Sequence, residues 1–303
     1  MSGIIDLQYV RFSVEDLAQQ QAFLREFGLT TEIADGTLIG RGTDASPYIY
    51  VATQGANAFL GMGFLAESAD DLRRIAAIDG LNIEQITDLP AGGERVRMTD
   101  PNGFAVDVVH GLQPVAPMHL TPRSPMNNAA EIGRLGDRVA LTPERNIVKR
   151  LGHCVINAID FRASEAWYKT RIGFITSDEI YIGEESRVLG AFMRVDRGDA
   201  YVDHHTLFCV GTGASGFNHA AFEVHDWDTL MLGHDRLKAG AYEHRWGVGK
   251  HLLGSQVFDY WKDPHGFTLE HFTDGDLMNR AFGSHRQPIE MLLGVHWGPE
   301  GSP

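Results

Sequence analysis

Apolar positions follow two local patterns along the chain, and the same succession of patterns occurs twice. Residues 7–14 (LQYVRFSV) form an apolar, strand-like run, and residues 15–27 (EDLAQQQAFLREF) carry apolar side chains at helical spacing. Gly28 favours the end of this helix because glycine readily adopts a positive φ. A strand-like run at 151–159 and a helical stretch at 162–172 repeat the arrangement. The pattern predicts two related units.

The later parts of the two units also correspond. Each has a strand that leads into an acidic helix start, at 64–72 and at 222–230. Each then has an Asp-Pro-x-Gly turn before a closing strand, at 100–103 and at 263–266. Proline presets φ and glycine accepts a positive φ, so this tetrapeptide suits a tight turn. The chain is therefore predicted to be an α+β protein that arose by duplication of a strand–helix–strands unit.

The same patterns divide the chain into four parts. We expect an N-terminal domain at 1–113, a connector at 114–146, a C-terminal domain at 147–273 and a tail at 274–303. The connector is rich in proline and should be extended, with one short helix at most. The tail shows no sustained period and is long enough to wrap over a neighbouring surface. Strand-rich stretches at 187–195 and 201–210 should supply the middle of the second unit.

Composition narrows the class of protein. The chain has 303 residues, 43% of them apolar and 22% charged, enough for a core in each of two domains. Its formal net charge of -14 disfavours nucleic acid and anionic membranes as partners. Two cysteines, Cys154 and Cys209, are too few for a disulfide scaffold or a thiolate zinc site. With no membrane-length apolar run and no secretion signal, we expect a cytoplasmic protein.

Histidine is distributed unevenly, which directs attention to the second half. Of 14 histidines, twelve follow residue 150. When the two halves are aligned, three residues of the second half have side chains that can bind a metal. At the corresponding positions of the first half, only one residue, a carboxylate, can do so. The matched positions are His153 with Tyr9, His219 with Gly61, and Glu270 with Asp107. Two neutral imidazoles and one carboxylate leave coordination positions open on a divalent ion, as in non-haem Fe(II) oxygenases.

Five stretches of the second half carry a resemblance to a known family. They are LGHCVI at 151–156, DHHTLF at 203–208, FNHAAFEV at 217–224, GKHLLGSQVFDYW at 249–261 and DPHGFTLEHF at 263–272. In this order they resemble the type I extradiol ring-cleaving dioxygenases of the vicinal oxygen chelate superfamily. The resemblance implies two domains of paired βαβββ modules that form incomplete barrels. The first would be metal-free and the second catalytic.

The resemblance also implies roles for individual residues. His153, His219 and Glu270 would be the ligands of Fe(II), with Mn(II) left open because these donors do not separate the two metals. His205 would be the catalytic acid and base. Strand alternation predicts that His204 and His205 point to opposite faces, so that only one enters the pocket.

Two further residues complete the implied active site. His251 would donate or accept a hydrogen bond near the substrate, and Tyr260 would contact a catechol oxygen. The sequence departs from the family at Gly254, where some members carry an acidic residue. Arg245 lies near the segment expected to bind a substrate carboxylate, although no clear carboxylate-binding set is present. The GSQVFDYW stretch and a polar pocket edge near Arg245 favour a substituted monocyclic catechol, and bicyclic, alkylated, carboxylated and trihydroxylated rings stay open.

The remaining histidines have no assigned role. The residues interpreted as solvated or supporting are His225, His234, His244, His265, His271, His285 and His296. His271, next to Glu270, should point away from the metal because neighbours in a strand face opposite ways. Trp246, Phe258, Trp261 and Phe192 fit either a substrate pocket or ordinary core packing.

The resulting functional hypothesis is extradiol cleavage of a catechol-type diol by O2, with a muconic semialdehyde-type product. The expected partners are a small catechol and O2, without nucleic acid or membrane, in a homo-oligomer. One alternative is a glyoxalase-like isomerase or thiol transferase of the same superfamily, which would not need the histidine of DHHT or the tyrosine of FDYW. The other is a non-catalytic protein that binds an aromatic compound or a metal.

Overall fold

The computed structural model describes residues 3–119, 125–139 and 145–302. The first half of these residues forms an eight-stranded sheet with the strand order β2-β3-β4-β1-β5-β8-β7-β6. Its elements are β1 (Ile4–Val14), α1 (Leu17–Phe27), β2 (Thr30–Ala34), β3 (Thr37–Arg41), β4 (Tyr50–Gln54), β5 (Ala58–Ala66), α2 (Ala69–Asp79), β6 (Glu84–Gln85), β7 (Glu94–Thr99) and β8 (Ala105–His110).

The second half forms a ten-stranded sheet with the order β19-β10-β11-β13-β9-β14-β17-β16-β15-β20. Its elements up to the closing strand are β9 (Val148–Ala158), α3 (Phe161–Arg171), β10 (Ile175–Tyr181), β11 (Val188–Arg194), β12 (Val202–Asp203), β13 (Leu207–Gly211), β14 (Gly216–Val224), α4 (Trp227–Ala239), β15 (Glu243–His251), β16 (Val257–Lys262) and β17 (Thr268–Thr273). The tail adds β18 (Leu277–Met278), a 3-10 helix (Arg280–Phe282), β19 (His285–Pro288), α5 (Ile289–Leu293) and β20 (Val295–Trp297).

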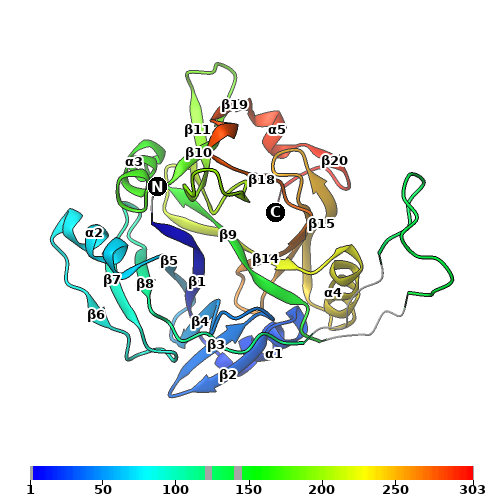
Figure 1. The fold of residues 1–303 in the computed structure, drawn as a ribbon, viewed down its shortest axis with the longest axis horizontal. Helices are drawn as coiled ribbons and strands as arrows, with labels where there is room; N and C mark the ends of the chain where they lie inside the picture. The colour runs from blue at the N-terminus through cyan, green and yellow to red at the C-terminus, as the bar shows by residue number, and fades with distance from the viewer. Residues whose placement is uncertain (1–2, 120–124, 140–144, 303) are drawn as a thin grey trace.

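Each sheet is built from two βαβββ modules. In the first, β1 and β5 each lead into a helix and three further strands, and β9 and β14 do the same in the second. The two leading strands of each half pair antiparallel at the centre of the sheet. Both sheets keep free edge strands in the described residues, so neither closes into a barrel. The predicted α+β fold of paired modules in incomplete barrels is confirmed, and Figure 1 shows the two halves side by side.

The helix ends follow from local chemistry. Asp16 caps α1 by accepting from the backbone N–H groups of Ala18 and Gln19, and Gly28 ends it at a φ of 106°. The predicted Asp-Pro-x-Gly turns also form, with Asp100 and Asp263 each accepting backbone N–H bonds across the turn. These bonds lie at equivalent places in the two halves, which accounts for the repeated motif.

The two halves share a continuous apolar core. Phe12 of β1 packs against Phe217 of β14 and Phe267 of the second half, with ring centroids 5.1 and 4.7 Å apart. Gln20 of α1 donates to Asp263, so the closing turn of the second half is tied to the first helix. Because the halves bury apolar surface against each other, the second sheet is held on a broad support.

The connector and the tail behave differently. The described connector residues form no helix, and residues 125–139 project from the body beside α4 (Figure 1). The tail instead joins the second sheet, because β19 pairs with β10 and β20 pairs with β15. The domain limits 1–113, 114–146, 147–273 and 274–303 stay a prediction.

One expected strand is interrupted. The stretch 201–210 was predicted to be strand-rich, but β12 ends at Asp203 and β13 begins at Leu207. His204 and His205 therefore lie in an irregular segment, and the alternation argument that separated their side chains does not apply to them.

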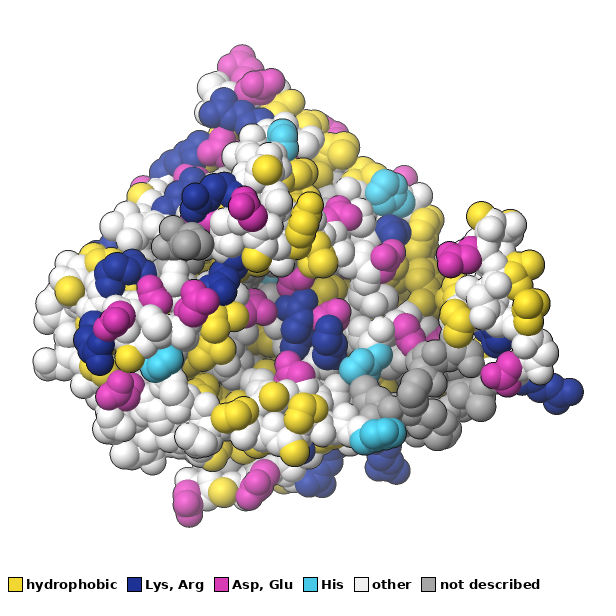
Figure 2. All heavy atoms as spheres, viewed as in Figure 1, with side chains coloured by type: hydrophobic (Ala, Val, Ile, Leu, Met, Phe, Trp, Pro, Cys, Tyr) yellow, Lys and Arg dark blue, Asp and Glu magenta, His cyan; other side chains and the backbone are white. Residues whose placement is uncertain are grey.

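The surface carries both signs of charge. On the face in Figure 2, Lys and Arg side chains are interspersed with Asp and Glu, so the net acidity does not form one continuous patch there. No helix in the described part of the chain is long and apolar enough to cross a membrane.

Candidate metal centre and substrate cavity

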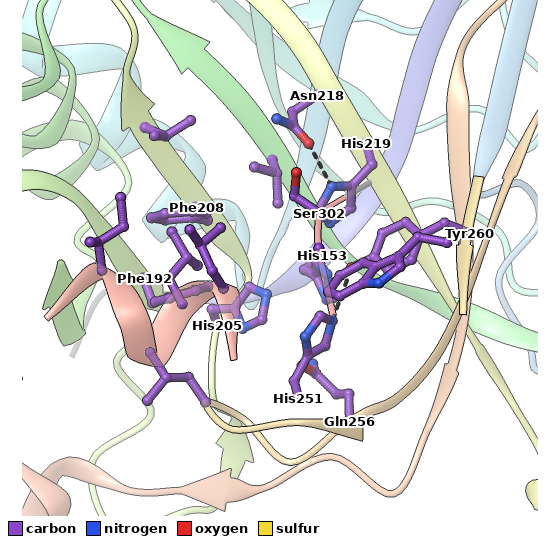
Figure 3. A pocket seen from close by; sticks show the side chains of 18 of the residues that line it. His153, Phe192, His205, Phe208, Asn218, His219, His251, Gln256, Tyr260 and Ser302 are labelled. Carbon is purple, nitrogen blue, oxygen red and sulfur yellow. Dashed lines mark hydrogen bonds between the residues drawn. The ribbon is translucent and has the colours of Figure 1, made fainter. Parts of the chain in front are cut away.

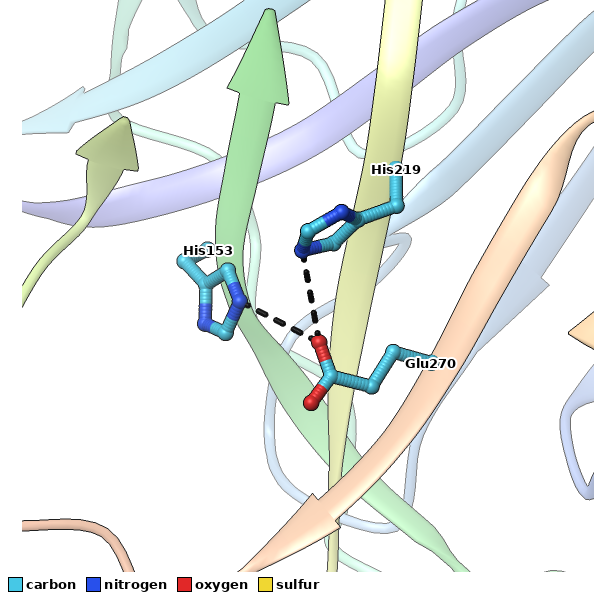
Figure 4. Close-up of side chains that lie close together, drawn as sticks. All are labelled: His153, His219 and Glu270. Atoms are coloured by element: carbon cyan, nitrogen blue, oxygen red, sulfur yellow. Dashed lines mark ion pairs between the residues drawn. The ribbon is translucent and has the colours of Figure 1, made fainter. Parts of the chain in front are cut away.

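The structure brings His153, His219 and Glu270 together. They come from β9, β14 and β17, three neighbouring strands of the second sheet, and their ligand atoms lie within 4.8 Å of one another. Nε2 of His153 is 3.3 Å and Nε2 of His219 is 3.4 Å from Oε2 of Glu270 (Figure 4). A set of one carboxylate and two imidazoles at this spacing fits a divalent ion.

The register of the two sheets explains why only the second half has this centre. His153 pairs with Ala221, which pairs with Glu270. In the first sheet the corresponding row is Tyr9, Gly63 and Asp107, and the residue two positions before Gly63 is Gly61. The correspondence inferred from the repeat is therefore correct in three dimensions.

The two equivalent carboxylates have opposite surroundings. Asp107 accepts hydrogen bonds from the hydroxyl of Tyr9 and from the guanidinium of Arg97. Both oxygens of Glu270 and Nδ1 of His153 are buried and make no hydrogen bond of ordinary geometry, although the hydroxyl of Tyr260 lies close enough to Glu270 to lower its pKa. A fully buried carboxylate without a donor is costly unless a cation compensates it. The donor set of the second half thus fits a divalent cation, whereas that of the first half is already satisfied.

Burial controls the protonation of this cluster. Burial lowers the pKa of His153 and of His219 to about 3, which leaves both imidazoles neutral and able to donate a lone pair. Burial raises the pKa of Glu270 to about 7 despite the neighbouring His219. A cation placed between these three side chains would favour the ionised carboxylate.

A neighbouring residue orients His219. Oδ1 of Asn218 lies 2.8 Å from Nδ1 of His219 and accepts a hydrogen bond from it, which leaves the lone pair of Nε2 directed toward Glu270 (Figure 3). Such hydrogen bonds fix the tautomer of a ligating histidine. Asn218 was not predicted from the sequence, although its position directly before a candidate ligand was a usable signal.

The centre opens into a cavity of about 270 Å³. Apolar walls come from Val155, Phe192, Phe208 and other side chains, while His205, His251 and Tyr260 add polar groups (Figure 3). The tail contributes further lining residues, which are Ile289, Leu292, Leu293, Gly301 and Ser302. The tail therefore does cover a neighbouring surface, and that surface is the cavity.

His205 reaches the cavity and His204 does not. His205 is a lining residue whose ring lies 4.0 Å from that of His153, centroid to centroid. Behind it, Nδ1 of His204 is 3.0 Å from Nδ1 of His205, and Nε2 of His204 is 2.7 Å from Oδ2 of Asp178. Only one of the pair enters the cavity, as expected, but an irregular backbone rather than strand alternation separates them. The role of Asp178 was not foreseen, because it lies on a different strand.

This chain of contacts selects the tautomer of His205. Asp178 can only accept when ionised, so Nε2 of His204 donates to it and Nδ1 of His204 is left as an acceptor. Nδ1 of His205 then donates to His204, and Nε2 of His205 keeps its lone pair. Burial is the largest single effect on Asp178 and opposes its ionisation, but the hydrogen bond and charge of His204, together with smaller effects of other neighbours, outweigh it and lower the pKa of Asp178. Burial also holds the pKa of His205 well below its ordinary value.

Tyr260 and His251 form a second polar pair in the cavity. The Tyr260 hydroxyl is 3.0 Å from Nε2 of His251 (Figure 3). Burial, followed by the charge of Glu270, holds the pKa of Tyr260 well above its ordinary value, so the phenol stays protonated. Burial lowers the pKa of His251 to about 3.

Several other sequence interpretations can be compared with the structure. Arg245 is exposed and does not line the cavity, so it does not form the expected polar edge of the pocket. Trp246 and Phe192 are lining residues, whereas Phe258 packs behind His251. His271 points away from the candidate metal centre as predicted, with Nε2 2.7 Å from the carbonyl oxygen of Phe27.

Comparison with known proteins first defines the class. Residues 150–271 match the family model described as the Glyoxalase/Bleomycin resistance protein/Dioxygenase superfamily. The second half, which carries the three candidate ligands and the cavity, therefore contains a domain of this superfamily. The resemblance inferred from the motifs is confirmed.

Individual relatives of this chain are named as catechol-cleaving or extradiol dioxygenases. The chain is 28% identical to metapyrocatechase 2 of Cupriavidus necator, over 98% of this chain and 90% of the relative. It is 24% identical to an iron-dependent extradiol dioxygenase of Rhodococcus jostii, over 99% of this chain and 98% of the relative.

Two solved structures share the fold of this chain. A Mn(II)-bound glyoxalase from Novosphingobium aromaticivorans has a TM-score of 0.78 at 19% identity and covers 99% of this chain and 92% of its own. The 2,3-dioxygenase LapB from Pseudomonas sp. KL28 also has a TM-score of 0.78, at 17% identity, and covers 96% and 99%. At these identities the likeness concerns the fold alone.

Proposed function

We propose that this protein is an extradiol dioxygenase that cleaves a catechol-type diol with O2 and releases a muconic semialdehyde-type product. The observation that carries the proposal is the fully buried Glu270, whose oxygens make no hydrogen bond of ordinary geometry and face two neutral imidazoles at the end of an aromatic cavity. The names of the relatives, metapyrocatechase and extradiol dioxygenase, support the same activity.

In this proposal His153, His219 and Glu270 hold Fe(II), with Mn(II) as the alternative metal. When bound, the ion would supply coordination sites at which a diol and O2 become neighbours, and it would favour ionisation of the diol. The name of the Rhodococcus relative favours iron. The Mn(II)-bound glyoxalase shares only the fold and keeps manganese open.

His205 is proposed to accept a proton from the bound diol and to return it later. Its Nε2 keeps a lone pair because Nδ1 is engaged by His204, so it can accept a proton from a bound diol and return it to an oxygen of the reacting group. His204 and Asp178 act as positioning residues, since they select this tautomer and hold the ring toward His153. General acid–base catalysis of this kind contributes roughly 10²–10⁴-fold to a rate.

Tyr260 and His251 are proposed to orient the substrate. A protonated phenol donates to a substrate oxygen, and the neutral His251 holds that phenol in place through their 3.0 Å contact. Apolar walls from Phe192, Phe208 and the tail residue Leu292 exclude water from the ring.

The cavity also narrows the proposed substrate. Its described lining residues include neither Lys nor Arg, and the polar ones besides the histidines and Tyr260 are Asn218, Gln256 and Ser302. A carboxylate substituent would be buried there without a countercharge, which is unfavourable. We therefore favour a catechol with an uncharged substituent.

Reconstitution of the purified protein tests the activity. The protein is loaded with Fe(II) without oxygen, and air is admitted with a panel of alkyl-, aryl- and carboxyl-substituted catechols. The expected result is O2 uptake with a yellow ring-fission product, fastest for uncharged substituents. Absence of uptake with every diol would refute the proposal.

The superfamily alternative, a glyoxalase-like isomerase or thiol transferase, is tested in parallel with a hemithioacetal substrate. The proposal expects no turnover of that substrate. His205→Ala should retain the metal and lose most diol turnover, whereas Glu270→Ala should lose the metal. Full activity of either variant would overturn the assigned role.

A further inference from the structure

A second group of two histidines and one carboxylate lies outside the cavity. It consists of His234 on α4, His244 on β15 and Asp259 on β16, and the ligand atoms lie within 4.8 Å of one another. Nε2 of His244 is 2.8 Å from Oδ1 of Asp259, and Nδ1 of His234 is 3.2 Å from each carboxylate oxygen. Both histidines had been interpreted from the sequence as solvated or supporting, and the structure brings them onto one buried carboxylate.

This group is separate from the candidate Fe(II) centre. Asp259 directly precedes Tyr260 on β16, and successive side chains of a strand point to opposite faces. Tyr260 lines the cavity, whereas Asp259 faces α4, which packs against β16. The cluster therefore lies between the outer face of the sheet and the helix that covers it.

The geometry suits a metal ion. Zinc binds histidine nitrogen and carboxylate oxygen at about 2.0–2.2 Å, so tetrahedral ligands lie roughly 3.3 Å from one another. The separations of 3.2 and 2.8 Å from Oδ1 are within a small side-chain adjustment of that value. The candidate Fe(II) centre shows similar separations, 3.3 and 3.4 Å, for the same kinds of donor.

The surroundings favour binding in two further ways. Nε1 of Trp261 donates to Oδ2 of Asp259, which holds the carboxylate and leaves Oδ1 toward the imidazoles. Asp259 is fully buried, but the side chains of His234 and His244 are 15% and 34% exposed. An ion can thus reach the group from solvent and still be held by a carboxylate shielded from water.

We propose that His234, His244 and Asp259 form a second, structural site for a divalent transition-metal ion such as Zn²⁺, with one position left to water. The ion links α4 to β15 and β16, the strands that carry His251 and Tyr260 on the cavity side. The site is independent of the proposed ring-cleaving activity, because none of its donors lines the cavity.

Zinc titration of the full chain tests the site. The protein is stripped with a chelator and titrated with Zn²⁺ alone by calorimetry, in a His219→Ala background that disables the first centre. We expect one Zn²⁺ per chain in this background and none after His244→Ala is added. His119→Ala, which removes an exposed histidine elsewhere, should leave the single site intact.

A second readout follows the link between helix and sheet. Zn²⁺ should raise the thermal midpoint of His219→Ala and have no such effect when His244→Ala is added. If His219→Ala is unstable, Glu270→Gln serves as the same background. Co²⁺ in place of zinc should give visible absorption bands that disappear with His244→Ala.

The outcomes separate this site from the proposed enzyme. If Zn²⁺ binds in neither the His219→Ala nor the Glu270→Gln background, or if binding survives His244→Ala, the proposed site is overturned. The cluster is then held by hydrogen bonds alone. Binding that depends on His244, together with no diol turnover by the Fe(II)-loaded wild-type protein, would support the site and refute the proposed function.

Discussion

Replacement of Glu270 by Gln should stabilise the metal-free protein, although it removes a proposed metal ligand. Glu270 is fully buried, and neither oxygen makes a hydrogen bond of ordinary geometry. Burial raises its pKa from 4.5 to about 7. At about 1.4 kcal/mol per pKa unit, this difference corresponds to about 3 kcal/mol for keeping the carboxylate ionised in the fold.

The pH dependence of this stability difference follows from proton binding by Glu270. The folded pKa is raised, so the contribution of the neutral carboxyl is fully present below pH 4.5 and is lost as the pH rises through about 7. The amide in Glu270→Gln does not ionise, so the variant does not lose stability in this way as the pH rises. The metal-free variant should match wild type near pH 4.5 and exceed it by about 3 kcal/mol at pH 8.

Urea unfolding of chelator-treated protein at pH 5 and pH 8 measures this difference. Asp107→Asn is the matched control, since Asp107 occupies the equivalent row but accepts from Arg97 and Tyr9. That substitution should destabilise the protein at pH 8. A divalent ion should then reverse the order for Glu270→Gln, because it occupies the centre of His153, His219 and Glu270 only in wild type, whereas any ion at the second site stabilises both proteins alike. If metal-free Glu270→Gln is less stable than wild type at pH 8, the argument from an uncompensated buried charge is refuted.

Three further outcomes are expected. His205→Ala should lower diol turnover at least about 10²-fold at unchanged metal content, measured by O2 uptake and metal analysis, and a loss of metal would contradict a purely catalytic role. Asp178→Asn should cost about 1.5–3 kcal/mol in urea unfolding at pH 7, because it weakens a hydrogen bond to a charged group. The pKa of Asp178 is lowered in the fold, so its contribution to stability is present above the ordinary value of 3.8 and disappears as the pH falls through the lowered pKa. A difference in unfolding free energy between wild type and Asp178→Asn that does not narrow below pH 4 would contradict this. Phe12→Ala should cost about 3–5 kcal/mol, because its ring packs against both halves, whereas Ile5→Ala on the exposed side of the same strand should cost little.

The repeat was the most informative property of the sequence. Matching the halves placed His153, His219 and Glu270 opposite Tyr9, Gly61 and Asp107, and the strand registers agree with that match. A duplicated fold keeps its strand pairing, so equivalent positions in the two sequences become equivalent positions in space. Helix ends and turns were equally readable, because a cap or an Asp-Pro-x-Gly turn depends on neighbours within a few residues.

Contacts between distant segments could not be predicted in this way. The surroundings of His205 depend on Asp178, 27 residues earlier on another strand, and on a break in the strand that its local sequence did not indicate. The second histidine cluster joins a helix and two strands, each with a histidine or aspartate that is unremarkable by itself.

Local sequence thus determined the repeated modules, their caps and turns, and the three residues proposed to hold a metal. Tertiary structure alone decided that the tail closes the cavity, that His204 and Asp178 orient His205, and that Arg245 stays outside. The reason is that periodicity and capping report interactions within one element. Which side chains from different elements meet is set by how the sheets and helices pack, and that depends on the whole chain.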